Sequence, residues 1–243
     1  MESRLAVSVV IPVRDDAALL RRCLEALAAQ RSRPDEVIVV DNGSTDGSAD
    51  VARELGARVV LEPEPGIPAA SACGFDAAAG AVIARLDADC VPPADWIERI
   101  RNAFAADASL DAITGPAHFV DGPRVLRRPL AALYLGSFLV TVAPALGHVP
   151  LFGSNLAVRR SAWRAVREQV HRHDTLMHDD IDLSVHLGPE RRIRYDLRLG
   201  MGISMRALRG DGMLRLRRGL HSIVAHWPEE FPVRRWWRRG RTA

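Results

Sequence analysis

The stretch AVIARLDADCVPP, residues 81–93, joins an apolar run to two carboxylates and then to two prolines. The apolar run predicts a buried β-strand, and Asp87 and Asp89 follow where that strand leaves the core. Asp-x-Asp tripeptides also form Asx turns, and Asp89 lies close enough to Pro92 to cap a following helix. The same side chains supply the oxygen ligands that Mg²⁺, Mn²⁺ and Ca²⁺ prefer. The stretch alone leaves both interpretations open.

Strand and helix signals alternate on both sides of this stretch. Helical periodicity or helix-start signals occur at residues 15–30, 48–56, 70–80 and 93–107, the last beginning at the two prolines. Strand-type runs occur at residues 6–13, 35–47, 57–66 and 81–89, the middle two running into turns. Such alternation predicts an α/β fold of right-handed βαβ units, with a mostly parallel central sheet flanked by helices.

Polar clusters follow three of the predicted strands. They are Arg14–Asp16, Asp41–Asp46 and Asp87–Asp89. Open α/β sheets bind ligands beyond the carboxyl ends of their strands. We therefore expect these three clusters to meet at one ligand site.

The composition is that of a globular protein with a basic end. The 243 residues are 48% hydrophobic and 26% charged, and all 33 basic residues are arginine. Residues 191–243 hold 14 arginines and four acids, which predicts an anionic neighbour. With no long linker in sight, we expect a single domain. It comprises two functional subregions, residues 1–115 and 116–210, and a basic tail at 211–243.

The cysteines and the apolar runs of the sequence indicate in which cellular compartment the protein is expected. The three cysteines lack CxxC spacing, which favours a reduced cytosolic compartment without a disulfide frame or a zinc site. Pro12 interrupts the first apolar run, so a strand is expected there rather than a signal peptide. The apolar stretch at 129–153 is broken by Pro144 and Gly147, which favours a buried or interfacial helix over a membrane span.

Three further motifs each have a structural and a functional interpretation. VVDNGSTDGS, residues 39–48, is rich in turn formers, but Asp41 could also accept from a base N–H or a ribose hydroxyl. FGSNLAVRRSAW, residues 152–163, reads as a loop entering a strand, with polar groups at Ser154 and Asn155. HDDIDLSVHL, residues 178–187, opens a helix whose N-terminus favours acids, yet one of them could act as a general base.

Taken together, five segments resemble, in sequence and in order, the bacterial inverting glycosyltransferases of family 2. The resemblance covers residues 5–210 and rests on VSVVIPVRDD, DEVIVVDNGSTDGS, GAVIARLDADCVPPADW, FGSNLAVRRSAW and HDDIDLSVHL. It implies a GT-A (Rossmann-like) fold, a nucleotide-diphosphate sugar donor and a divalent cofactor, Mn²⁺ or Mg²⁺. Asp87 and Asp89 correspond to the family's DxD pair, with Asp89 the expected direct metal ligand. Asp180 takes the place of the catalytic base, and Asp179 replaces a glutamate.

The resemblance makes residues 1–115 the nucleotide-sugar-binding subregion and residues 116–210 the acceptor and catalytic subregion. It also implies two groups of binding residues. The acceptor side is expected to include Gly153, Ser154 and Asn155. The nucleotide-sugar side is expected to include Pro12, Val13, Arg14, Asp16, Asp41, Ser44, Arg85, Asp87, Ala88, Asp89 and Arg206.

The chain departs from the family pattern in two places. Residues 70–72 read Ala-Ser-Ala where many relatives have Ala-Arg-Asn, so a polar donor contact is lost or supplied elsewhere, with Arg85 as a candidate. The segment GISMRALRG, residues 202–210, lacks the family's metal-binding histidine. Ser204 and Arg206 are the candidates in its place, and Arg206 could neutralise a diphosphate directly.

The tail HWPEEFPVRRWWRRGRTA, residues 226–243, is either a frayed terminus or a membrane-binding segment. Tryptophan with arginine suits an anionic bilayer surface and thus a lipid-linked acceptor. No nucleic-acid-binding motif surrounds the basic residues, so a nucleic-acid partner is not expected.

The sequence therefore predicts an inverting glycosyltransferase that acts on a glycan, lipid-linked or other glycoconjugate acceptor. We expect it to be cytoplasmic, or peripheral on the cytoplasmic face of the membrane. One alternative is a nucleotidyltransferase, although IPVRDDAALL, residues 11–20, lacks a glycine-rich phosphate loop. The other is a non-catalytic module of the same fold that binds a membrane or a partner.

Overall fold

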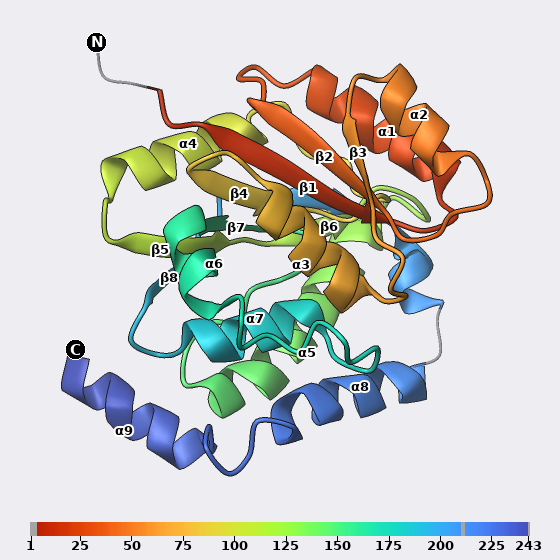
Figure 1. Cartoon of the computed structure of the whole chain (residues 1–243). Coiled ribbons are helices and arrows are strands. Elements are labelled where there is room, and N and C mark those ends of the chain that lie inside the picture. Colours follow the sequence, from red (N-terminus) through yellow and green to blue (C-terminus); the bar gives the residue numbers. More distant parts are fainter. Residues whose placement is uncertain (1–3, 210–211, 243) are drawn as a thin grey trace.

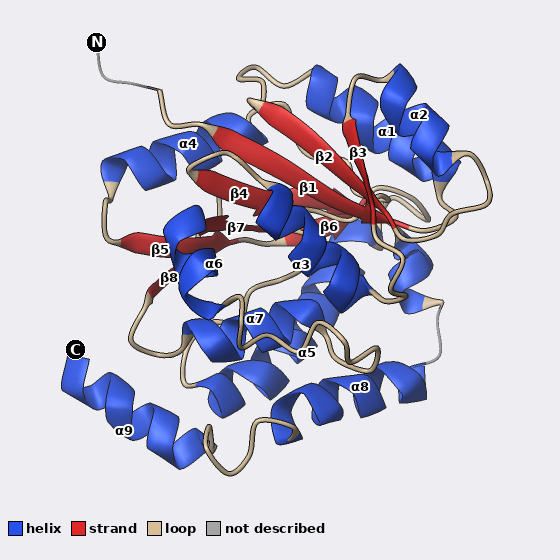
Figure 2. Ribbon diagram, in the orientation of Figure 1, coloured by secondary structure: helices blue, strands red, loops and turns tan. Residues whose placement is uncertain are grey.

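The computed structural model describes residues 4–209 and 212–242. A seven-stranded sheet forms its centre, in the order β3-β2-β1-β4-β7-β5-β8 (Figures 1 and 2). Strands β1 to β4 are parallel, β7 runs antiparallel to β4 and β5, and β8 is parallel to β5. This arrangement confirms the α/β fold with a mostly parallel sheet. Its strands are β1 (Val7–Val13), β2 (Glu36–Asp41), β3 (Arg58–Leu61), β4 (Val82–Arg85), β5 (Leu110–Thr114), β7 (Leu156–Arg159) and β8 (Arg192–Tyr195).

Helices cover both faces of this sheet. One core cluster packs helices α1 and α4 against β1 side chains such as Val9 and Ile11, and the other packs α3, α6 and α7 against Val10. Successive residues of β1 thus serve opposite cores, as the twofold alternation of a strand requires. The helices are α1 (Ala17–Ala28), α2 (Ser48–Glu54), α3 (Ile67–Ala77), α4 (Trp96–Ala106), α5 (Arg127–Leu146), α6 (Arg160–Val166), α7 (Asp179–Leu187), α8 (Gly212–Val224) and α9 (Pro232–Thr242).

Helix α3 lies unusually close to the sheet because of one glycine. A Cβ atom at Gly74 would come within 2.3 Å of Val10 Cγ1 and 2.8 Å of Val40 Cγ2. Any larger residue would therefore push α3 away from β1 and β2. Close packing here brings the N-terminal end of α3 against the carboxyl ends of those strands.

The chain bends at Gly115–Pro116, between β5 and β6 (Ala117–Phe119), and β6 pairs with β9 (Met201–Ile203) in a separate two-stranded sheet. A Cβ atom at Gly115 would lie 2.2 Å from the Leu199 carbonyl oxygen, so the chain turns where only glycine fits. Helix α4 begins at Trp96 after Asp95, so Asp89 does not cap it.

Helix α5 is more exposed than a buried helix would be. It is long and apolar enough, by length and composition alone, to cross a membrane, with a mean hydropathy of 1.7, yet only 22% of that stretch is buried. Leu133 and Val140 are 70% and 75% exposed. The prediction of a buried helix is therefore wrong, and the interfacial alternative stays a prediction.

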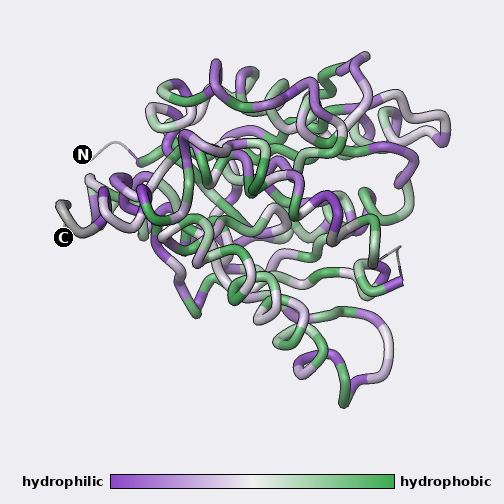
Figure 3. The backbone as a smooth tube through the Cα atoms, turned by 90° about the horizontal axis from the view of Figure 1, so that it is seen from below, coloured by the Kyte–Doolittle hydropathy of each residue, from purple (hydrophilic) through white to green (hydrophobic). Residues whose placement is uncertain are grey.

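The C-terminal tail is helical and packed. Helices α8 and α9 lie along one end of the molecule, below α7 and α5 in Figure 1, and α9 is largely hydrophilic in Figure 3. Arg235 is 1% exposed and donates from Nε to the Leu146 carbonyl oxygen, 2.6 Å away, at the end of α5. The alternative of a frayed terminus is therefore wrong. Trp236 and Trp237, by contrast, are 55% and 61% exposed.

Candidate active site

A cleft of about 720 Å³ opens at the carboxyl ends of β1 and β4. Its lining brings together polar residues that lie far apart in sequence, which is where an open α/β sheet binds ligands. Ten of the predicted site residues line it: Pro12, Val13, Arg14, Asp16, Asp87, Ala88, Asp89, Ser154, Asp179 and Arg206. The polar clusters that follow β1 and β4 therefore line the same cleft.

The third cluster, after β2, supports the cleft from behind. Asp41 is 7% exposed and accepts a 2.9 Å hydrogen bond from the Ser44 backbone N–H, while Ser44 Oγ accepts from the Asp15 N–H at 3.1 Å. Among the described residues that line the cleft, neither Asp41 nor Ser44 appears. The neighbouring Asn42 does, and its amide holds the loop after β3 by donating to the Glu62 and Glu64 carbonyl oxygens.

Arg206 joins the carboxylates of two strand ends. It follows β9 in the short 3-10 helix η1 (Met205–Leu208). Its Nε lies 2.7 Å from Asp89 Oδ2 and its Nη1 lies 2.8 Å from Asp16 Oδ1. Burial and then the charge of Asp87 raise the pKa of Asp89, although Arg206 acts to lower it. The positively charged guanidinium of Arg206 therefore lies beside the DxD pair, in the segment that lacks the family's metal-binding histidine.

A second, buried arginine joins the other carboxylates. Arg85 is 3% exposed, and its Nη2 lies 3.0 Å from Asp87 Oδ1 and 3.3 Å from Asp179 Oδ2. Burial acts to lower the pKa of Arg85, but the charges of Asp179 and Asp87 outweigh it and raise that pKa. Arg85 does not appear among the described residues that line the cleft. Arg85 therefore orients the carboxylates of Asp87 and Asp179 from outside the cleft. A direct contact between Arg85 and the nucleotide sugar, in place of the arginine of the family's Ala-Arg-Asn motif, has no support here.

Asp180 lies beside the cleft and behind Asp179. The Gly153 backbone N–H donates to Asp180 Oδ2 at 2.8 Å. A Cβ atom at Gly153 would come within 2.0 Å of Arg85 Nη1 and 3.2 Å of Asp180 Oδ2, so glycine is required at this contact. Burial and then the charge of Asp179 raise the pKa of Asp180. A carboxylate with a raised pKa is a better proton acceptor than an ordinary aspartate.

Two acceptor-side assignments fare differently. Ser154 lines the cleft and hydrogen-bonds Asp87. Asn155 is fully buried: its Oδ1 accepts from Trp96 Nε1 at 2.9 Å, and its Nδ2 donates to the Leu199 carbonyl oxygen at 2.6 Å. The assignment of Asn155 to the acceptor site is therefore wrong, because its amide is already used in holding β7 against α4 and the segment before β9.

Oxygen ligands from Asp87 and Asp89 suit a divalent cation of the Mg²⁺ or Mn²⁺ type. Ligand atoms of these two residues and Cys90 lie within 4.8 Å of one another. Cys90 is fully buried, and that burial raises the pKa of its thiol well above its ordinary value, so it stays protonated and is a poor ligand. The residues fit a cation held by two carboxylates, with its other positions open to water and phosphate oxygens.

Sequence analysis missed several residues that line the cleft. One, Asn42, directly follows β2 inside the predicted cluster 41–46, and the others come from loops and helices: Tyr134, Phe152, Thr175, His178 and Arg218. Asn42 and His178 are direct neighbours of Asp41 and Asp179, which is a signal that could have identified them. The others reach the cleft only through tertiary packing.

Comparison with known proteins identifies relatives by sequence. Among curated proteins, glycosyltransferase AglE of Haloferax volcanii is 40% identical over 121 residues, covering 46% of this chain and 40% of that protein. The undecaprenyl-phosphate 4-deoxy-4-formamido-L-arabinose transferase of Aeromonas hydrophila is 38% identical over 107 residues, covering 40% and 33%. The chain spans about half the length, or less, of the curated relatives it matches.

Solved structures show the same fold. Glucosyl-3-phosphoglycerate synthase of Mycobacterium tuberculosis superposes with a TM-score of 0.65 at 20% identity, over 91% of this chain and 80% of that one, which confirms the GT-A fold. That enzyme has also been crystallised with Mn²⁺, UDP and glucosyl-3-phosphoglycerate. The family model for glycosyl transferase family 2 matches residues 8–167. The chain therefore belongs to glycosyl transferase family 2.

Proposed function

We propose that this chain transfers a sugar, with inversion, from a nucleotide-diphosphate sugar to a hydroxyl group of a glycan or lipid-linked acceptor. The observation that carries the proposal is the convergence of Asp16, Asp89 and Arg206 on one cleft, with Asp180 beside it. Glucosyl-3-phosphoglycerate synthase has the same fold and has been crystallised with UDP and Mn²⁺, which supports a nucleotide donor.

The donor half of the cleft supplies the groups that a nucleotide diphosphate needs. Pro12, Val13 and Asp16 at the end of β1 provide a wall for the nucleoside, and Arg206 provides a guanidinium for the diphosphate. A divalent cation bound by Asp87 and Asp89 would neutralise charge that develops on the leaving diphosphate. Arg206 lies 2.7 Å from Asp89, so its charge acts at the same place.

The acceptor reaction requires one base. In our proposal Asp180 takes the proton of the acceptor hydroxyl, whose oxygen attacks the anomeric carbon as the bond to the diphosphate breaks. The Gly153 N–H holds the carboxylate in position, and Asp179 is held by Ser71 Oγ at 2.6 Å and by Arg85. A single displacement of this kind inverts the anomeric configuration.

A lipid-linked acceptor is supported by relatives and by surface chemistry. The Aeromonas relative is named for transfer to undecaprenyl phosphate. The exposed apolar side of α5 and the tryptophans of α9 lie on helices that pack together through Arg235. We propose that these helices rest on the cytoplasmic face of an anionic membrane.

Nucleotide binding is the first expected result. We expect one of UDP-, GDP- or dTDP-sugar to raise the melting temperature in the presence of Mn²⁺, because a ligand at 100 times its Kd stabilises the folded state by about 2.7 kcal/mol. Differential scanning fluorimetry measures this shift. An Asp16→Asn, Asp89→Asn variant is the control and should lose the shift. Absence of stabilisation by every nucleotide would refute the donor site.

The products separate transfer of a sugar from transfer of a nucleotide. A glycosyltransferase releases a nucleoside diphosphate, whereas a nucleotidyltransferase releases pyrophosphate from a nucleoside triphosphate. Because no glycine-rich loop follows β1, we expect the first product only.

Membrane binding is the second expected result. Replacing Trp236 and Trp237 by serine should weaken binding to phosphatidylglycerol vesicles severalfold, because both side chains are more than half exposed on the basic helix α9. Arg235 is kept, but Trp236 Nε1 also donates to the Pro144 carbonyl oxygen of α5 at 2.8 Å. The single variant Trp237→Ser, which keeps both contacts, should therefore weaken binding in the same direction. Leu61→Ser with Leu197→Ser is the matched control, since both leucines lie outside α5, α8 and α9 and are more exposed than the two tryptophans. Sedimentation with vesicles measures the effect, and unchanged binding would exclude α9 as the membrane contact.

A further inference from the structure

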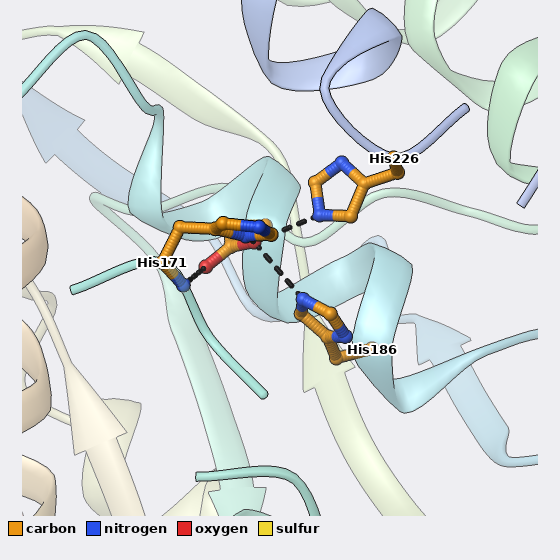
Figure 4. A group of neighbouring side chains, drawn as sticks. His171, His186 and His226 are labelled. Carbon is orange, nitrogen blue, oxygen red and sulfur yellow. Dashed lines mark hydrogen bonds and ion pairs between the residues drawn. The ribbon is translucent and has the colours of Figure 1, made fainter. Parts of the chain in front are cut away.

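A second group of ligand-type side chains lies outside the cleft, around Asp182. The ring nitrogens His171 Nδ1, His186 Nε2 and His226 Nε2 lie 2.8, 3.2 and 2.9 Å from Asp182 Oδ1. The four ligand atoms lie within 4.8 Å of one another. Figure 4 shows the three imidazole rings converging on this carboxylate.

Three separate segments contribute to this cluster. Asp182 and His186 are four residues apart on α7, which places them on one face of that helix. His171 comes from the loop after α6, and His226 follows the C-terminal end of α8. Asp182 and His226 are 2% and 6% exposed, whereas the His171 side chain is 40% exposed and leaves a path to solvent.

Hydrogen bonding within the protein does not satisfy the cluster. His226 Nδ1 lies 2.8 Å from the Ser222 carbonyl oxygen, and because a carbonyl can only accept, Nδ1 carries a proton. A neutral His226 then turns the lone pair of Nε2 toward the carboxylate. His186 Nε2 is buried and faces Asp182 Oδ1 at 3.2 Å, without the alignment of a hydrogen bond. A metal ion at the centre would bind the Nε2 lone pairs of His226 and His186, and the imidazoles could then stay neutral. Without it, they would have to be protonated to bond the carboxylate, and buried charges of the same sign would lie side by side.

The surrounding contacts are those of a metal site. The Nδ1–H of His226 donates to a carbonyl, which fixes the tautomer that leaves Nε2 free to bind a metal. The His171 backbone N–H donates to Asp182 Oδ2 at 2.7 Å, which leaves Oδ1 facing the three rings. Both contacts orient the ligand atoms toward one point.

We propose that His171, Asp182, His186 and His226 bind one Zn²⁺ ion in a structural site. Three imidazoles and one carboxylate are a donor set that zinc accepts in tetrahedral geometry, and four protein ligands close the site. Zinc–ligand bonds of about 2.0–2.2 Å place tetrahedral ligands about 3.3–3.6 Å apart. The three ring nitrogens lie 2.8–3.2 Å from Asp182 Oδ1, and all four atoms lie within 4.8 Å of one another, so shifts of about 1 Å bring them to this geometry. The expectation of no zinc site considered only cysteines, and this site uses none.

The position of the site indicates what the ion would stabilise. It would tie the loop after α6 and the end of α8 to α7, the helix whose first turn carries Asp179 and Asp180. The loop between His171 and α7 also carries Thr175 and His178, which line the cleft. Zinc would thus hold one wall of the cleft through its backbone, with Asp182 two residues after Asp180 on the same helix.

Metal analysis of the full 243-residue chain tests the proposal. After removal of loosely bound metal, we expect one Zn²⁺ per chain by atomic emission spectrometry. In metal-stripped protein, Co²⁺ should give the intense visible absorption of a four-coordinate site, and one equivalent of Zn²⁺ should abolish it. Zinc should also raise the melting temperature of the stripped protein. A chain that retains no zinc and gives no such Co²⁺ spectrum would overturn the proposal.

Variants locate the ion. His226→Gln and the half-exposed His171→Ala should each lose the bound zinc and the Co²⁺ absorption. His221→Gln is the matched control, because His221 lies on α8 five residues before His226 and pairs with one carboxylate, Asp174, outside the cluster. Asp87→Asn with Asp89→Asn should keep its zinc. Loss of zinc in that double variant, or its retention in a folded His171→Ala protein, would place the ion elsewhere.

Discussion

Replacing Asp180 by asparagine is expected to lower the turnover number of sugar transfer by about 10²–10⁴-fold, the usual contribution of a general base. Asparagine has nearly the same shape but cannot take a proton at neutral pH. Its amide oxygen can still accept the hydrogen bond that the Gly153 N–H donates, so the fold should survive. Of the described residues, Asp179 lines the cleft and Asp180 does not, so donor KM should change little. Steady-state kinetics with saturating acceptor measure both quantities.

The dependence of the turnover number on pH is an independent test of Asp180 as the base. The base acts when deprotonated, so the turnover number should fall as pH falls through the pKa of Asp180. Burial and the charge of Asp179 raise that pKa, so the acid limb should lie above the value of about 3.9 that is usual for aspartate. The residual activity of Asp180→Asn should lack this limb.

Asp179→Asn is the comparison that can overturn the assignment. It keeps the base but weakens the contacts to Arg85 and Ser71, so we expect a smaller loss. If Asp180→Asn kept full activity while a folded Asp179→Asn protein lost it, Asp179 would be the base.

The fold was predictable because its signals are local. The runs that became β1, β2 and β4 are mostly apolar, and each ends at or just before a polar residue: Arg14, Asp41 and Arg85. The carboxyl ends of parallel strands meet at one edge, so placing Asp16 near Asp87 and Asp89 required only topology. Arg206 is different, because it lies 117 residues from Asp89 and was placed by the family resemblance alone.

The errors arose where tertiary contacts decide. Asn155 resembles an exposed loop residue in sequence, yet Trp96 and the Leu199 carbonyl capture its amide. The basic tail resembles a solvated end, yet buried Arg235 anchors it to α5. The histidine cluster escaped notice because only Asp182 and His186 have local helical spacing, while His171 and His226 arrive from other segments.

Replacing Arg206 by glutamine is expected to lower kcat/KM by about 10²–10³-fold, the usual loss when a preorganised donor to developing charge is removed. Its guanidinium reaches Asp89 at 2.7 Å and Asp16 at 2.8 Å, at the edge of the cleft where we place the diphosphate. Its side chain is 46% exposed, so these ion pairs should add only about 0–1 kcal/mol to the free energy of unfolding. The variant should therefore fold normally, and urea denaturation checks this.

Arg209→Gln is the matched control, three residues further along the same segment and absent from the described cleft lining. It should keep the wild-type rate. Since Arg206 acts to lower the pKa of Asp89, the glutamine variant should also hold its Asp89 proton to higher pH. Its activity should then depend more steeply on Mn²⁺, because no guanidinium remains to neutralise the leaving group. If Arg206→Gln turned over at the wild-type rate with the wild-type Mn²⁺ requirement, Arg206 would serve only to pair the two aspartates, and the diphosphate would need another cation.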